Sequence, residues 1–306
     1  MQKTLRSRVS FDGTGLHSGC AVRITVSPAS ANYGIWFRRT DVDTADNLVA
    51  ARWNQVERTP LCTRLVNDAG VTVSTVEHIM AALAGCGIQN ALVELDGPEV
   101  PILDGSSAQF VSAFLAAGVV EQAEPAQVLR VLRRVEVTDG EARAVLQPSD
   151  IFEIAFDISF SDEAIGTQSK TMSLANGAFV RELCDSRTFC RQADVDKMRA
   201  AGLALGGNYR NAVVVDGPRV LSPGGFRHTD EAVRHKMLDA LGDLALAGAP
   251  LLARYTGDKS GHSLTNTLLR ALFADPANYA VETCTPQLAA LLPGANLHAA
   301  DMRLVA

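Results

Sequence analysis

With 306 residues, the chain is long enough for one large domain or two ordinary ones. Its formal charge of −6 excludes a basic field that would attract nucleic acid, and 47% hydrophobic with 20% charged residues is typical of a globular protein. The six cysteines form no C-x-x-C pair, which favours reduced thiols over a disulfide framework or a thiolate zinc site. No run reaches the ~18 apolar residues of a membrane helix and the start does not resemble a signal peptide, so we expect a cytoplasmic protein without stable membrane insertion.

The first part of the chain is predicted to be rich in strands and then helical. Residues 3–66 alternate short runs of branched apolar residues with turns. The run GTGLHSG at 13–19 lies between two such strands and its glycine spacing does not fit a dinucleotide loop, so we interpret it as a turn. A helix over 74–87, a strand over 90–97 and a second helix over 104–118 follow.

A domain boundary is predicted at the polar, proline-containing stretch EQAEPAQ, residues 121–127. It separates an N-terminal domain, residues 1–121, from a C-terminal domain, residues 128–306, that repeats the order of strands followed by helices. The elements expected in the second domain are strands near 128–138, 142–147, 151–160, 167–173 and 250–256, and helices near 175–184, 229–247 and 261–273. Two such halves predict an α+β fold.

A strand–helix–strand insertion is predicted near residues 187–216, with its helix near 193–201 and its last strand at 212–216. It holds more apolar residues than a segment of this size needs in order to fold, namely Val195, Met198, Leu203, Leu205 and Val213. Two interpretations stay open: these side chains either line a hydrophobic channel or form a small core of their own.

Glu77 and His78 lie in the first turn of the helix predicted over 74–87. Because the positive end of the helix dipole disfavours a protonated imidazole, His78 is suited to bind a metal, with Glu77 beside it as a general base. A purely structural alternative also fits, since Ser74 and Glu77 match the S-x-x-E pattern of a capping box. Spacing leaves both interpretations open.

The helix predicted over 229–248 has two incompatible faces, with Thr229 as its expected N-cap. One face is an apolar stripe that must be buried, formed by Val233, Met237, Leu241 and Leu244. About 200° around the axis, at 3.6 residues per turn, lies a polar stripe formed by His235, Asp239 and Asp243. Most such stripes face water, but a histidine and a carboxylate one turn apart can also clamp one metal ion.

His78, His235 and Asp239 together form a set of two histidines and one carboxylate. This set suits a catalytic zinc ion with a fourth position open for water, and it suits non-haem iron(II) equally well. His262 is the next candidate, because Asp243 could orient its ring and support its cationic form. Lys236 and Lys259 flank these residues and would meet phosphates as point charges, or would be ordinary surface lysines.

Three segments stand in an order and at separations that resemble one family: STVEH at 74–78, VRHKMLDALGD at 233–243 and KSGHSLTN at 259–266. The chain resembles the UDP-3-O-acyl-N-acetylglucosamine deacetylases, the zinc amidases of bacterial lipid A synthesis. Further matches are TGLHSG at 14–19, the run GIQNALVELDGPEVPILDGSSAQF at 87–110, SRTF at 186–189 and GLALGGNYRNAVVVD at 202–216. The resemblance spans essentially the full length.

The resemblance implies roles for individual residues. The zinc ligands would be His78, His235 and Asp239. The catalytic groups would be Glu77 as general base, His262 with Asp243 as the second histidine and its carboxylate, and Thr188 as a hydroxyl that holds the oxyanion. The substrate would be bound by Phe189, by Lys236 and Lys259 near the sugar and diphosphate, and by Phe160 stacking on uracil. Either His262 or Glu77 would protonate the leaving amine.

The implied fold has two similar two-layer α+β domains, with helices packed between the sheets and the site at the domain junction. The implied reaction is zinc-dependent removal of the N-acetyl group from UDP-3-O-acyl-N-acetylglucosamine, the committed step of lipid A biosynthesis. The insertion would be the passage for the acyl chain. We expect a monomer that binds no nucleic acid.

Two rival hypotheses remain at this point. Another metal-dependent amidase or nucleotide-sugar hydrolase could share the ligands and would act on UDP-N-acetylglucosamine without the acyl chain. A non-enzymatic, zinc-stabilised nucleotide-sugar-binding module would bind metal and ligand and leave the acetyl group in place.

Overall fold

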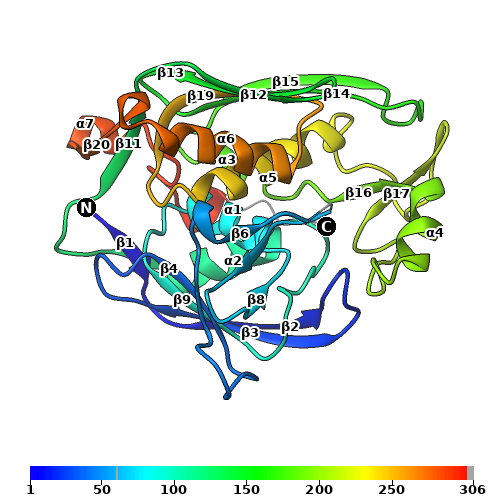
Figure 1. Ribbon diagram of the computed structural model, residues 1–306, viewed down its shortest axis with the longest axis horizontal. Coiled ribbons are helices and arrows are strands. Elements are labelled where there is room, and N and C mark those ends of the chain that lie inside the picture. Colours follow the sequence, from blue (N-terminus) through cyan, green and yellow to red (C-terminus); the bar gives the residue numbers. More distant parts are fainter. Residues whose placement is uncertain (60, 302–306) are drawn as a thin grey trace.

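The computed structural model describes residues 1–59 and 61–301 and shows an α+β fold. Two sheets form the outer layers, and helices lie between them (Figure 1). One sheet is built from the first part of the chain and the other from the second part. The predicted fold class, two sandwiches with their helices between the sheets, is therefore confirmed. No helix in the described ranges is long and apolar enough to cross a bilayer.

The lower sheet in Figure 1 has five strands in the order β2-β3-β9-β4-β5, with β4 parallel to β9. Alternate residues of β3, Val22, Ile24 and Val26, are buried, as expected for a sheet with one covered face. The elements of this half are β1 (Lys3–Leu5), β2 (Val9–Thr14), β3 (Ala21–Pro28), β4 (Ile35–Arg39), β5 (Leu48–Ala50), a 3-10 turn (Trp53–Gln55), β6 (Val56–Glu57), β7 (Arg64–Val66), β8 (Thr72–Val73), α1 (Glu77–Gly85), β9 (Ala91–Leu95), α2 (Ala108–Ala117) and β10 (Val119–Glu121).

The upper sheet has seven strands, with the path β12-β13-β19-β11-β20 and with β14 pairing both β15 and β19. Helices α5 and α6 cover its inner face (Figure 1). The elements of this half are β11 (Gln127–Val131), β12 (Val135–Asp139), β13 (Ala142–Pro148), β14 (Glu153–Ser159), β15 (Thr167–Ser173), α3 (Ala178–Glu182), α5 (Glu231–Ala245), β19 (Leu251–Asp258), α6 (His262–Ala274), β20 (Tyr279–Thr283) and α7 (Pro286–Ala289), with 3-10 turns at Pro276–Asn278 and Ala299–Asp301.

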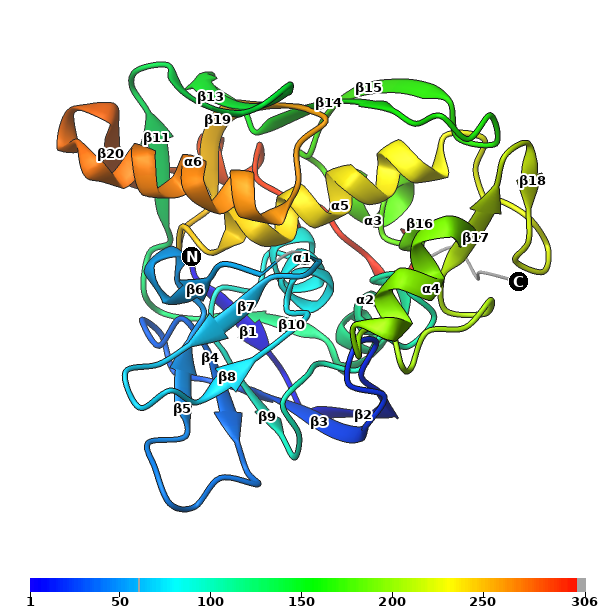
Figure 2. The ribbon, with the colours of Figure 1, turned by 45° about the vertical axis from the view of Figure 1, so that its right-hand side comes forward.

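The insertion projects from the side of this two-layer body, where α4 lies beside β16 and β17 (Figure 2). Its elements are β16 (Phe189–Arg191), α4 (Gln192–Ala200), β17 (Val213–Asp216) and β18 (Arg219–Val220). The predicted strand–helix–strand order is present, with β16 parallel to β17. No residue of α4 is fully buried, so the helix does not close a core of its own.

Helix α5 is the centre of the molecule and is buried on both of its predicted faces. Val233, Met237, Leu241 and Leu244 are at most 2% exposed, as the apolar stripe requires. The helix begins at Glu231, and its cap residue is Asp230, whose side chain accepts no capping bond. The expectation that Thr229 caps the helix is therefore wrong, because the first turn is held instead by the ion pairs of Asp230 and Glu231.

Helices α1 and α5 approach each other closely because Gly242 stands at their contact. A Cβ atom at this position would lie 2.0 Å from the carbonyl oxygen of Glu77. This close contact brings the first turn of α1, with Glu77 and His78, against the polar stripe of α5.

Candidate metal centre and active site

The three residues predicted to bind a metal converge between α1 and α5. His78 is the second residue of α1, and His235 and Asp239 lie one turn apart on α5. Each offers one ligand atom, and these atoms lie within 4.8 Å of one another. Nε2 of His78 and Nε2 of His235 are 3.6 and 3.2 Å from Oδ1 of Asp239. All three side chains are buried, so the polar stripe of α5 faces the interior and not water.

The donor set fits a divalent metal ion. Oδ1 of Asp239 is buried yet accepts no hydrogen bond from any residue that the structure describes, although buried polar atoms are nearly always paired. A cation between this oxygen and two imidazole nitrogens would satisfy it. Two histidines and one carboxylate are ligands of catalytic zinc and equally of non-haem iron(II).

The ring of His235 is oriented by a backbone carbonyl. Its Nδ1 lies 2.9 Å from the oxygen of Ser186, which assigns the ring proton to Nδ1 and leaves the lone pair of Nε2 facing Asp239. Burial lowers the pKa of His235 to about 4. The ring is therefore neutral at physiological pH, which is the form that binds a metal.

Glu77 is 3% exposed and lies next to the candidate metal ligand His78 without being part of the ligand set. Its Oε2 accepts a hydrogen bond from the backbone N–H of Thr63 at 3.0 Å, and its Oε1 lies 3.8 Å from Nε2 of His262. Helix α1 has no side-chain cap, and the N–H of Ser74 donates to Pro98, so the capping-box interpretation is wrong. Burial raises the pKa of Glu77, which makes its carboxylate a stronger base.

His262 and Asp243 form a hydrogen-bonded pair at the start of α6. Nδ1 of His262 lies 2.9 Å from Oδ2 of Asp243, and its Nε2 points toward Glu77 and Asp239. Burial acts to lower the pKa of His262, but the carboxylates of Asp243 and Glu77 outweigh it and raise the pKa to about 10. The carboxylates thus prevail over the position at the helix N-terminus, and the ring is held as a cation.

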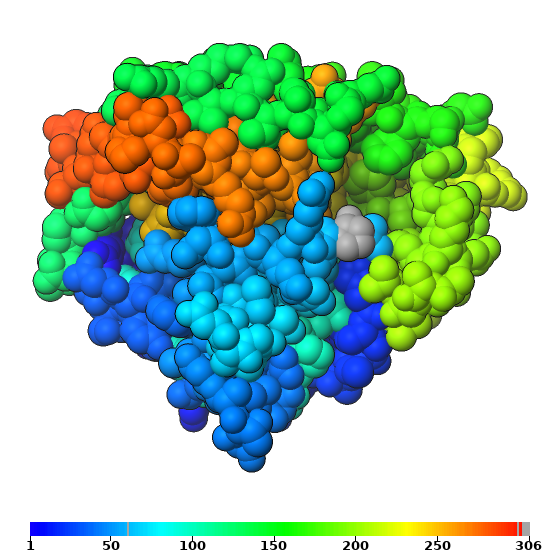
Figure 3. All heavy atoms as spheres, in the orientation of Figure 1, coloured from blue at the N-terminus to red at the C-terminus, as the bar shows by residue number. Residues whose placement is uncertain are grey.

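His235, Asp239 and His262 line a cavity of about 870 Å³. In the space-filling view the surface is hollowed between the yellow-green insertion and the blue N-terminal half (Figure 3). The predicted site residues on its wall are Phe160, Thr188, Phe189, His235, Lys236, Asp239, Lys259 and His262. Leu16 and Leu61 from the first half and Val195 and Met198 from the insertion add an apolar lining.

Comparison with known proteins gives one result over most of the chain. The model of the family described as UDP-3-O-acyl N-acetylglycosamine deacetylase matches residues 2–274. The chain belongs to this deacetylase family. The UDP-3-O-acyl-N-acetylglucosamine deacetylase of Phenylobacterium zucineum is 49% identical over 288 residues, 94% of this chain and 98% of the relative. Those of Shewanella sp. strains W3-18-1 and ANA-3 are each 46% identical over 275 residues, 89% of this chain and 90% of the relative.

In this member of the deacetylase family, the predicted substrate-binding residues occupy different parts of the cavity wall. The rings of Phe160 and Phe189 pack edge to face, with centroids 5.4 Å apart. Nζ of Lys236 lies 4.0 Å from Oδ2 of Asp239, close to the metal ligands. Nζ of Lys259 donates to Oε2 of the exposed Glu141 at 2.7 Å, so a bound anion would compete with that carboxylate.

The structure adds two residues to the candidate site: Thr63, which the sequence analysis did not single out, and His17, which appeared there only within the matching segment TGLHSG. Thr63 donates its backbone N–H to Glu77 and its hydroxyl to Oδ1 of Asp243 at 2.5 Å, so one residue holds both carboxylates. His17 lines the cavity, and both of its ring nitrogens are buried without a hydrogen-bond partner among residues 1–59 and 61–301. Neither residue belongs to a periodic pattern, because each lies in an irregular segment beside a short strand.

Proposed function

We propose that this chain hydrolyses the N-acetyl group of UDP-3-O-acyl-N-acetylglucosamine, releasing acetate and UDP-3-O-acyl-glucosamine, the committed step of lipid A biosynthesis. The observation that carries the proposal is the convergence of a buried candidate ligand set, a buried glutamate and a histidine–aspartate pair, of which His235, Asp239 and His262 line one cavity, in a member of the deacetylase family. The proposal places the reaction in the cytoplasm, and it needs only a monomer because one chain supplies every residue of the site.

His78, His235 and Asp239 would hold the metal, which we propose to be zinc, with iron(II) as the alternative. A bound zinc ion polarises the acetamide carbonyl and lowers the pKa of water. The task left to the chain's own residues is to move two protons and to hold the substrate.

Glu77 is the proposed general base. Burial raises the pKa of its carboxylate, and the hydrogen bond from Thr63 fixes Oε2 while Oε1 stays directed into the site. Glu77 takes the proton of the attacking water. The hydroxyl of Thr188, on the cavity wall, would donate to the tetrahedral oxyanion.

His262 is the proposed general acid. The pair with Asp243 keeps the ring protonated, and its Nε2 faces the same space as Glu77. The amine must be protonated to leave, and a buried imidazolium supplies that proton without a water channel. Glu77 could return the proton that it took, so the two residues compete for this role.

The remaining wall of the cavity would bind the rest of the substrate. We assign Phe160 to stacking on uracil, Phe189 to the sugar side, and Lys236 and Lys259 to the sugar and diphosphate. We further propose that residues 1–121 and 128–306 are the two domains, with the site at their junction. The insertion at 187–216 would form the acyl passage, since its apolar residues line the cavity.

The experiment that tests the proposal compares two substrates on one protein. The account predicts rapid acetate release from UDP-3-O-acyl-N-acetylglucosamine and release slower by at least ~100-fold from UDP-N-acetylglucosamine, because the acyl chain contributes buried apolar area. Equal rates would favour a general nucleotide-sugar amidase. Binding of both compounds without acetate release would favour the non-enzymatic module.

A further inference from the structure

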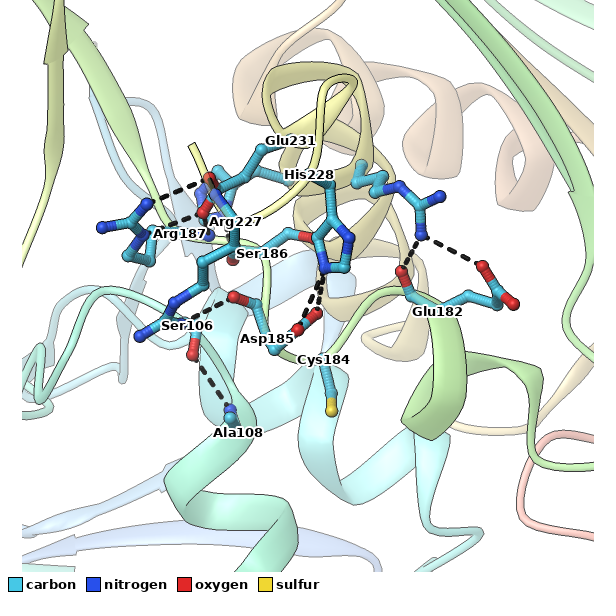
Figure 4. A network of polar contacts seen from close by, with 12 residues as sticks. Ser106, Ala108, Glu182, Cys184, Asp185, Ser186, Arg187, Arg227, His228 and Glu231 are labelled. Atoms are coloured by element: carbon cyan, nitrogen blue, oxygen red, sulfur yellow. Dashed lines mark hydrogen bonds and ion pairs between the residues drawn. The ribbon is translucent and has the colours of Figure 1, made fainter. Parts of the chain in front are cut away.

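Glu231, the first residue of α5, is buried. Its carboxylate accepts more hydrogen bonds than a carboxylate that only caps a helix would accept. The residue is 1% exposed. Its Oε1 accepts from the backbone N–H of Arg187 at 3.0 Å and from Nε of the same residue at 2.8 Å. Its Oε2 accepts from Nη2 of Arg187 at 3.1 Å and from the backbone N–H of Arg227 at 2.6 Å (Figure 4).

The peptide bond between Ser186 and Arg187 is held at both ends by side chains of α5. Its N–H donates to Glu231, and its carbonyl oxygen accepts from Nδ1 of His235 at 2.9 Å. Glu231 and His235 are four residues apart, so their side chains project from one face of the helix, one turn from each other. Because the peptide group is planar and rigid, holding its N–H fixes the direction of its carbonyl.

We propose that Glu231 is a positioning residue of the metal centre, which acts through the Ser186–Arg187 peptide to hold the ring of His235 in the orientation that presents Nε2 to the metal. The inference rests on the proposed metal site. Hydrogen-bond partners of ligating histidines typically contribute 10–100-fold to metal affinity or activity. Here the partner is itself a backbone group, so its position depends on what holds that backbone.

Stability alone is a poor explanation for this arrangement. A buried ion pair such as Glu231–Arg187 is often no more stabilising than apolar residues of the same volume, because both charges lose their water. Burial acts to raise the pKa of Glu231, but the hydrogen bonds from Arg187 outweigh it and hold the pKa below its usual range. The carboxylate is thus a charged acceptor, which makes the contact with the peptide N–H stronger than a neutral one.

The same network reaches the other proposed histidine ligand. Arg227 also donates to Oδ2 of Asp104 at 2.9 Å and to the carbonyl of Asp185 at 2.7 Å. The loop that starts at Asp104 contains Ser107, whose hydroxyl donates to the carbonyl oxygen of His78 at 2.8 Å. The backbone carbonyl of His78 on α1 and the ring of His235 on α5 are therefore linked through these hydrogen bonds and the chain segment 104–107.

The test uses Glu231→Gln in the full chain, with Asp230→Asn as the matched control. Both variants remove one negative charge from the start of α5, but Asp230 pairs with Lys170 and Arg234 and does not contact the peptide. The zinc dissociation constant is measured by competition with a chelator, together with the visible spectrum of the cobalt(II)-substituted protein, kcat and KM. Melting of the metal-free proteins reports the folding of each variant.

We expect E231Q to fold, to bind zinc about 10–100-fold more weakly, to change the cobalt(II) spectrum and to lower kcat more than it changes KM. D230N should stay within about threefold of the wild type in zinc affinity, since it leaves the histidine's partner in place. A folded E231Q with the zinc affinity and cobalt(II) spectrum of the wild type would overturn the proposal. Should E231Q not fold, Glu231→Asp, which withdraws the carboxylate by one methylene, is tested with the same readouts and the same two outcomes.

Arg187→Lys separates the peptide contact from the ion pair. It keeps the backbone N–H that donates to Glu231 and loses the two-pronged guanidinium contact. We expect lower thermal stability with near-normal zinc affinity. A loss of zinc affinity as large as in E231Q would assign the effect to the ion pair and contradict the peptide route. A wild-type protein that binds no zinc would refute the proposed metal site itself, and this inference with it.

Discussion

Glu77 and His78 are neighbours in the chain, yet their side chains have different contacts and different proposed roles. The ring of His78 points to Asp239, whereas the carboxylate of Glu77 is held away from the ligand atoms by the N–H of Thr63. A carboxylate that is fixed, buried and not a ligand can accept a proton without disturbing the metal. The geometry is thus consistent with the proposal that proton transfer and metal binding belong to different side chains at adjacent positions.

The first prediction follows from this separation. Glu77→Ala should retain stoichiometric zinc and lose at least ~100-fold in kcat, the usual contribution of a general base. His235→Ala and Asp239→Ala should lose the metal as well as activity, because each removes a proposed ligand. Metal analysis and steady-state kinetics of the three purified variants check this. A zinc-free Glu77→Ala protein would contradict the division of roles.

Thr63 is a second residue whose effect can be isolated. Thr63→Val keeps the shape and the backbone N–H bound to Glu77 but removes the hydroxyl that donates to Asp243. Leaving that buried acceptor without its donor should lower the free energy of unfolding by about 1–3 kcal/mol. Thr63→Ser keeps the hydroxyl and is the matched control. The free energy of unfolding of both variants is measured in denaturant. Equal values for the two variants would argue against this contact.

At the scale of elements, the site depends on how closely α1 and α5 pack. The carbonyl oxygen of Glu77 lies 2.0 Å from the position of a Cβ on residue 242, so only glycine permits the contact. Because His78 is on one helix and His235 and Asp239 are on the other, the distance between the helices sets the distance between the ligands.

Gly242→Ala tests this packing, because helix propensity alone predicts that the change raises stability, whereas the close helix contact predicts that it lowers stability. In an open helix the change would stabilise by about 0.5–1 kcal/mol. Here the new methyl would lie 2.0 Å from the oxygen of Glu77, so we expect lower thermal stability and weaker zinc binding, with the helices forced apart. Ala245→Gly, at the half-buried end of α5, measures the propensity effect alone. A Gly242→Ala protein with raised stability and unchanged zinc affinity would refute the packing argument.

Helix α5 also shows what a sequence can and cannot predict about an element. Its two faces followed from spacing, and its apolar stripe is buried as periodicity requires. Its polar stripe was open to a solvated interpretation, because burial of that face depends on α1, which lies about 150 residues earlier in the chain. The prediction that Thr229 caps the helix was wrong for a similar reason. Arg187 and Lys170, which bind Glu231 and Asp230, lie in distant segments of the chain.

For the molecule as a whole, the class of fold and the position of the ligand segments could be predicted, whereas the contacts that support them could not. Thr63 bonds to Asp243 across 180 residues and Ser186 to His235 across 49, and no local pattern encodes either contact. The family resemblance pointed to Glu77, His262 and Thr188, because those residues lie in recognisable segments. Supporting residues such as Glu231 become visible only when distant backbone groups are placed beside them.

The cavity between the N-terminal half and the insertion yields a prediction about the substrate. Met198 on α4 lines the cavity, and Met198→Trp should narrow it. Losing contact with about two methylenes of a long acyl chain costs ~1.6 kcal/mol, so kcat/KM should fall ~10-fold for the long-chain substrate and little for a short-chain one. Asp196→Asn, on an exposed position of the same helix, is the control. An equal fall for both chain lengths would argue against an acyl passage here.

The most direct test of the whole account is acetate release from UDP-3-O-acyl-N-acetylglucosamine before chelation, after chelation, and after stoichiometric return of zinc or iron(II). Acetate measured in each state reports the reaction class and the use of the metal together. The account predicts that acetate release disappears when the metal is removed and returns when the metal is restored. In the Glu77→Ala variant, no metal loading should restore the release. A folded, metal-loaded wild-type protein that releases no acetate, or one whose release survives complete removal of the metal, would contradict it.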